Sequence, residues 1–173
     1  ISTSTASASA TLDITSGIDS TYDSYEFHFV NIHPATSGAS FQFQVNAAGA
    51  SGFNETMTTT YFRAYHNEAD GTTGLVYMTV WDQAQGTAYQ PITYQIGADN
   101  DQSASGVLTM YAPSSTTYVK HFVSRSNTAI PSDYTVEANA AGYINVTAAI
   151  DEISFKFNTG NIDAGTIKMF GVS

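Results

Sequence analysis

Histidine and aspartate are the residue types in this sequence that could bind a metal ion. The four histidines, His28, His33, His66 and His121, show no His-x-His or His-x₃-His spacing, and a histidine metal site needs two or three of them to converge. The turn Asp99-Asn100-Asp101 offers hard oxygen ligands suited to Ca²⁺, but no bidentate glutamate follows it. Turn carboxylates commonly hydrogen-bond their own backbone. Asp99 and Asp101 are therefore only weak candidates, and we predict neither a metal nor another cofactor.

Hydrolytic chemistry has no recognisable residue set. Nothing in the sequence pairs two of the glutamates as a glycosidase requires; they are Glu26, Glu55, Glu68, Glu137 and Glu152. The chain has no Gly-x-Ser-x-Gly elbow, no phosphate-binding loop and no cysteine. We therefore predict no catalytic residues and a protein that is not an enzyme.

Aromatic side chains are the remaining chemical signal, with eleven tyrosines, ten phenylalanines and one tryptophan. Six lie in or beside predicted loops: Tyr22, Tyr61, Tyr65, Trp81, Tyr89 and Tyr143. Tyrosine supplies amphipathic contact area at a low cost in entropy, which suits a face that binds sugar or protein. The alternative is that these rings cap the ends of the fold or lie in a subunit interface.

Alternating strands must position these residues. Residues 25–32, 41–46 and 149–157 alternate large apolar side chains with polar ones, which is typical of half-buried β-strands. The alternation predicts a buried set comprising Phe27, Phe29, Phe43, Phe155 and Phe157. Residues 55–68 are ambiguous, because threonines favour a strand while Tyr61 and Tyr65 would also share a helix face.

The strand count predicts the fold class. Roughly nine to eleven short strands at spacings of about eight to fifteen residues, without an amphipathic helix, indicate an antiparallel sandwich or barrel. We predict an all-β, single-domain antiparallel β-sandwich that is jelly-roll-like over residues 11–173, with extra strands in the long middle loops. Residues 1–10 form a Ser/Thr/Ala tract that we interpret as a flexible lead-in or linker, and residues 140–143 as a break.

Charge excludes several partners. Fifteen acidic and five basic residues give a net charge of −10, so the basic footprint of a nucleic-acid binder is missing. No run of eighteen apolar residues is present, so we expect no membrane insertion. Only 12% of residues are charged, which leaves strand edges weakly protected against pairing. We expect self-association, as a homotrimer that strengthens with ionic strength.

Several stretches together resemble one family of proteins. They are residues 18–27 (IDSTYDSYEF), 30–36 (VNIHPAT), 65–68 (YHNE), 99–102 (DNDQ), 113–122 (PSSTTYVKHF) and 160–171 (GNIDAGTIKMFG). The chain resembles, over roughly residues 12–172, small structural or tail-fibre-like virion proteins of marine tailed bacteriophages. The resemblance implies a virion part and brings no catalytic or metal residues with it.

The function we expect is that of a non-enzymatic structural protein of a tailed bacteriophage, located on the surface of the virion. It would be tail-fibre- or adhesin-like, with a surface for host attachment. Its partners would be further copies of itself, other virion proteins and a glycan of the host surface. The alternatives are a capsid-decoration or head-fibre protein and a free carbohydrate-binding module.

Overall fold

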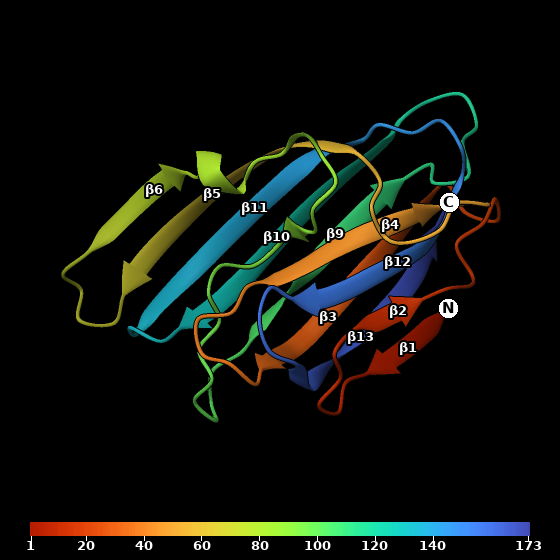
Figure 1. The fold of residues 1–173 in the computed structure, drawn as a ribbon. Helices are drawn as coiled ribbons and strands as arrows, with labels where there is room; N and C mark the ends of the chain where they lie inside the picture. The colour runs from red at the N-terminus through yellow and green to blue at the C-terminus, as the bar shows by residue number, and fades with distance from the viewer.

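Two antiparallel β-sheets of unequal size pack face to face in the computed structural model, which describes residues 1–173 (Figure 1). Helical structure is limited to one 3₁₀ turn, η1 (Thr79–Trp81). No helix has the length and apolar character needed to cross a membrane. The protein is therefore an all-β sandwich, as the alternating sequence pattern predicts.

The large sheet has nine strands in the order β1-β13-β3-β9-β10-β11-β5-β6, with β7 paired to β5. Their bounds are β1 (Ser2–Thr5), β13 (Ile162–Val172), β3 (Ser24–Pro34), β9 (Ala104–Tyr111), β10 (Lys120–Ile130), β11 (Tyr134–Ile144), β5 (Met57–Asn67), β6 (Thr73–Tyr77) and β7 (Ala84–Gly86). Its two edges are thus β1, close to the N-terminus, and β6, from the middle of the chain.

The small sheet has four strands in the order β2-β12-β4-β8. Their bounds are β2 (Leu12–Ile14), β12 (Ile150–Phe157), β4 (Phe41–Ala47) and β8 (Gln90–Pro91). Across the two sheets the pairing is nested: β1 with β13, β2 with β12, β3 with β9, and β4 with β8. This nested order over eight strands is that of a jelly roll, and β5–β7 and β10–β11 are insertions into its middle loops.

The core lies between the two sheets and is dominated by phenylalanine. Phe27 and Phe29 of β3 face Phe155 and Phe41 of the small sheet, with ring centroids 5.8 and 5.7 Å apart respectively. All five phenylalanines predicted to be buried are at most 3% exposed, which confirms the predicted strand faces. Burial of such rings stabilises a fold by roughly 1.5–3 kcal/mol each.

Residues 1–10 differ from the flexible lead-in predicted for them. Residues 2–5 form β1, which pairs in register with β13, and Ser9 forms a bridge with Ile162. The Ile1 amino group donates a hydrogen bond to the Met169 carbonyl at 2.6 Å. The small side chains of this tract have no hydrophobic period, so its backbone pairing with an edge strand was invisible in the sequence.

Residues 140–143 also differ from the break predicted there. They continue β11, where Ala140 pairs with Tyr61 and Gly142 with Thr59 of β5. Gly142 is needed because a Cβ atom at this position would lie 2.4 Å from the Thr58 carbonyl oxygen. The glycine therefore marks a close approach of two strands rather than the end of one.

Lys120, one of the five basic residues, is completely buried at the start of β10. Its Nζ donates to the carbonyls of Val146, Thr147 and Ala148 at 3.1, 2.9 and 2.5 Å. Burial lowers the pKa of its ammonium group, and the charge of Glu55 acts in the opposite direction. Lys120 thus fastens the 146–148 loop to the large sheet.

The large sheet extends beyond the small one. Beyond β10 it continues with three more strands, β11, β5 and β6, which we call the overhang (Figure 1). The segment from Met78 to Ile96 covers the near part of the overhang, where Gln90 accepts a hydrogen bond from Thr59 at 2.7 Å. This cover buries Tyr61, while Arg63 and Tyr65 further along β5 remain partly exposed.

Candidate functional site

Three of the six aromatic residues predicted to bind a partner lie apart from one another. Tyr22 packs edge-on against Tyr25 at 5.8 Å, near the start of β3. Tyr89 donates to the Ser154 hydroxyl at 3.1 Å and lies 4.0 Å below the Lys156 ammonium group. Tyr143 lies on the outer face of the large sheet, 6.4 Å from the ring of His121. These three rings do not form a common surface.

The other three, Tyr61, Tyr65 and Trp81, come together on the inner face of the overhang. Tyr61 and Tyr65 project from the same face of β5 because their positions differ by an even number. Trp81 comes from η1 and packs against Tyr61 at 4.8 Å. The pairing of Met78 N–H with the Tyr61 carbonyl, at 2.9 Å, holds the η1 turn against β5.

Two further tyrosines and one arginine complete this surface. Tyr94 stacks on Trp81 with ring centroids 5.1 Å apart, and Tyr134 of β11 lies 5.9 Å from Tyr65. Arg63 lies between, with its guanidinium carbon 3.7 Å from the Tyr94 centroid and 5.0 Å from that of Tyr65. We call this set the aromatic–arginine row; its members are Tyr134, Tyr65, Arg63, Tyr94, Trp81 and Tyr61.

Arg63 is the unusual member, because no anion of the protein neutralises it. The three ion pairs of the structure are formed by His28, His66 and Arg125, none of them by Arg63. Its Nε hydrogen is buried and has no hydrogen-bond acceptor. The aromatic faces of Tyr94 and Tyr65 attract the cation, an effect worth about 0.5–2 kcal/mol depending on desolvation. The rings therefore hold the guanidinium in place while leaving its hydrogen-bonding capacity unused.

The two ends of the row differ in solvent access. Tyr61 is fully buried, and this burial strongly raises the pKa of its phenol. Tyr65 and Tyr134 are only partly buried. Tyr65 lies against β6 at Gly74, where a Cβ atom would come within 2.6 Å of the tyrosine hydroxyl. The buried end therefore anchors the row, and the partly exposed end is available to a ligand.

Sequence reasoning missed Arg63, Tyr94 and Tyr134. Residues 90–96 alternate in the sequence as a longer strand would, with Ile92, Tyr94 and Ile96 on one face, whereas only Gln90–Pro91 is a strand. A usable signal was nevertheless present around Arg63. If residues 57–67 are extended, Tyr61, Arg63 and Tyr65 must share one face. The helical alternative considered for this segment hid that row.

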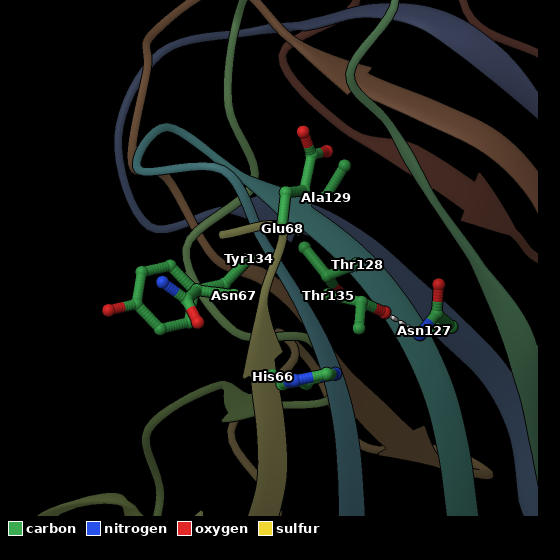
Figure 2. Close-up of a pocket in the computed structure, with 8 residues that line it drawn as sticks. All are labelled: His66, Asn67, Glu68, Asn127, Thr128, Ala129, Tyr134 and Thr135. Carbon is green, nitrogen blue, oxygen red and sulfur yellow. Dashed lines mark hydrogen bonds between the residues drawn. The ribbon is translucent and has the colours of Figure 1, made fainter. Parts of the chain in front are cut away.

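The opposite face of the same strands bears a depression of about 460 Å³ (Figure 2). In the close-up, His66, Thr135 and Asn127 lie on one side of the ribbon, and Tyr134 and Asn67 on the other. Asn127 donates to the Thr135 hydroxyl at 2.8 Å, and His66 pairs with Asp70 at 3.0 Å. Asn127 and His66 thus have partners in the protein, whereas the buried Thr128 hydroxyl has none.

The weak metal candidates Asp99 and Asp101 are both exposed in their turn. Asp101 lines a depression of about 520 Å³ with His33 and Asp163, and the His33 Nδ1 atom bonds the Gln102 carbonyl at 2.8 Å. Nowhere does the structure bring three or more histidine, aspartate or glutamate side chains into a group that could hold a metal ion.

The outer face of the large sheet has a distinct composition. Eight of the large hydrophobic side chains that are at least 41% exposed project from it: Val30, Phe62, Leu75, Tyr77, Tyr111, Val123, Phe170 and Val172. The outward-facing residues of its strands include three acidic ones, Glu26, Glu137 and Asp163, and two basic ones, Arg125 and Lys168. Arg125 and Glu137 pair at 2.7 Å. Three acidic against two basic residues leave this face close to neutral, although the whole chain carries −10.

No protein-family model, no curated protein and no solved structure matches this chain.

Proposed function

We propose that the protein is a non-enzymatic structural subunit on the surface of a tailed-bacteriophage particle, tail-fibre- or adhesin-like, which self-associates and presents a surface for host attachment. The observation that carries the proposal is the outer face of the large sheet, where eight large hydrophobic side chains are exposed on strands whose charges almost cancel. Exposed apolar patches rimmed by polar residues mark interaction sites. The resemblance to virion proteins and the jelly-roll fold, which capsid and lectin domains also use, agree with this role.

Self-association through the outer face fits the charge distribution. A subunit of charge −10 repels its copies at long range, while its nearly neutral outer face adds little of that repulsion at contact. Salt shortens the range of the repulsion to about 10 Å at 0.1 M. A homotrimer that becomes more stable as ionic strength rises is the expected assembly.

Light scattering of the purified chain at low and at high salt tests the assembly. We expect an oligomer that Val123→Lys disrupts, because Val123 lies in the middle of the outer face and is 48% exposed. Val80→Lys is the matched control, since Val80 is 80% exposed but lies on η1, away from that face. A wild-type monomer at both salt concentrations would contradict the proposed assembly.

Immunogold electron microscopy of phage particles tests the location. Label on the tail supports the tail-fibre role, and label over the head supports the alternative of a capsid-decoration or head-fibre protein. Particles without label would favour a free carbohydrate-binding module. The specific observation in favour of that alternative is the aromatic–arginine row, whose partly exposed rings and unpaired cation do not depend on assembly.

A further inference from the structure

We infer that the exposed end of the aromatic–arginine row binds a glycan whose sugar units carry carboxylate groups. The inference deepens the attachment role proposed above by naming the ligand class, and it rests on that role. It follows from three properties of the site: an unpaired guanidinium, the aromatic surfaces beside it and the charge of the rest of the molecule.

The unpaired guanidinium is the first step. Of the five cationic side chains, Lys120 is buried on carbonyls, Arg125 pairs with Glu137 and Lys156 lies over Tyr89. Lys168 is exposed on the outer face. Arg63 alone is held between aromatic rings on the inner face of the overhang. A guanidinium so fixed is preorganised for a planar, bidentate partner, and carboxylate is the anion that this fork fits.

The neighbouring rings are the second step. Tyr65 lies beside Arg63, and Tyr134 lies beside Tyr65, the two ring centroids 5.9 Å apart and the ring planes inclined at 60°. Both are partly exposed, so each offers an apolar face together with a hydroxyl group. The apolar C–H face of a sugar ring can pack on such a surface while its carboxylate reaches Arg63. Gly74 makes room for the Tyr65 ring, because the side chain of any larger residue there would collide with it.

The charge of the molecule is the third step, because it determines how the ligand must bind. One cation in a chain of net charge −10 cannot attract polyanions from a distance. Recognition must therefore occur at contact, and a single sugar unit would bind weakly. Several copies of the row in one assembly would strengthen binding to a repeating polysaccharide through increased effective concentration.

Titration of the full chain with trigalacturonate tests the inference, with fluorescence of Trp81, the single tryptophan, as the signal. Trp81 stacks on Tyr94, and the Arg63 guanidinium lies over the other ring of this pair, that of Tyr94. A ligand bound to Arg63 should therefore change the emission of Trp81. The fully methyl-esterified trimer is the matched ligand, because it keeps the sugars and removes the charge. A sulfated neutral trisaccharide is the third probe, and it distinguishes carboxylate recognition from general attraction of anions.

We expect the acid trimer to bind at least tenfold more tightly than its methyl ester and than the sulfated sugar. Arg63→Met should abolish this preference, and Arg63→Lys should reduce it because lysine keeps the charge without the fork. Gly74→Ala should weaken binding by displacing Tyr65. Lys168→Gln removes one positive charge on the outer face and should change binding by less than twofold. Thermal unfolding of each variant establishes that it is folded.

Equal binding of the acid and ester trimers by the wild type would overturn the inference without involving any variant. So would unchanged acid binding in folded Arg63→Met. Neither result bears on whether the protein assembles or lies on a phage particle. Conversely, a monomer that binds the acid trimer through Arg63 would leave the ligand class standing and contradict the assembly.

Discussion

The inner face of the large sheet is covered differently in two regions. In one, which we call the closed half, β3 faces β4 and β12 of the small sheet; the other is the overhang. In the closed half, the apolar face of one sheet meets the apolar face of another, and rings such as Phe29 and Phe41 pack across the interface with centroids 5.7 Å apart. In the overhang, the same face of the large sheet meets a loop and then solvent. There Tyr65 and Tyr94 pack against a cation, the guanidinium of Arg63. Complete burial suits stability, and incomplete burial leaves groups free for binding.

Truncation of a ring should show this difference most strongly. Phe155→Ala, in the closed half, should lower the free energy of unfolding by about 3–5 kcal/mol, because a fully buried ring leaves a cavity. Tyr134→Ala, in the overhang, should lower it by only about 1 kcal/mol, since its ring is partly exposed. Denaturant unfolding monitored by circular dichroism measures both. Equal losses would mean that the overhang is as well packed as the core.

Substitution of Lys120 measures how much its hydrogen bonds stabilise β10, the strand between the two regions. Lys120→Met preserves much of the side-chain volume but leaves three carbonyls without their donor. Because hydrogen bonds to a charged group contribute roughly 1.5–3 kcal/mol, we expect a loss of about 2–3 kcal/mol. Lys168→Met, on an exposed lysine, is the control and should have little effect. A variant as stable as the wild type would show that burial of the ammonium group offsets its three bonds.

The two most deeply buried tyrosines should respond oppositely to loss of their hydroxyl groups. The Tyr25 hydroxyl, in the closed half, donates to the Asp19 carboxylate at 2.9 Å and accepts from the Asp19 N–H at 3.0 Å. Tyr25→Phe should therefore destabilise by about 1 kcal/mol. The buried Tyr61 hydroxyl has no partner in the protein, so Tyr61→Phe should be neutral or stabilising. Thermal unfolding of both variants measures these effects. A lower melting temperature for Tyr61→Phe would contradict the absence of a partner for its hydroxyl.

The loss of stability at low pH should be the smallest effect, and one carboxylate in each region should contribute to it. Hydrogen bonds from Thr21 and then Tyr25 lower the pKa of Asp19, and those from Arg125 and then Asn139 lower the pKa of Glu137. These carboxylates therefore add stability above their ordinary pKa values of 3.8 and 4.5, and that stability is lost as pH falls through the lowered values. Asp19→Asn and Glu137→Gln should each flatten the melting temperature between pH 5 and pH 2, taken as about the range over which such groups titrate. An unchanged acid profile in both variants would contradict this assignment.

The closed half was predictable from sequence and the overhang was not, for a physical reason. Phe27 and Phe29 alternate with polar residues because one face of β3 is entirely covered, so the period-2 pattern is clean. Along β5 the covered face carries Tyr61, Arg63 and Tyr65, whose polar atoms reach water or have no partner. A face that is neither core nor surface gives no clean alternation. The set that meets at Arg63 comes from β5, β11 and the 78–96 loop, and only tertiary structure unites them.

The positions of the chain ends give the molecule a direction. The Ile1 amino group is bonded to Met169 near the C-terminus, and both ends lie at the β1 edge of the large sheet, remote from β6 (Figure 1). Six strand spacings of about 4.8 Å separate β1 from β5, so Arg63 stands roughly 30 Å from the ends across the sheet. A bead or sensor surface coupled to either terminus would therefore hold the subunit by one margin and point its guanidinium toward the solution.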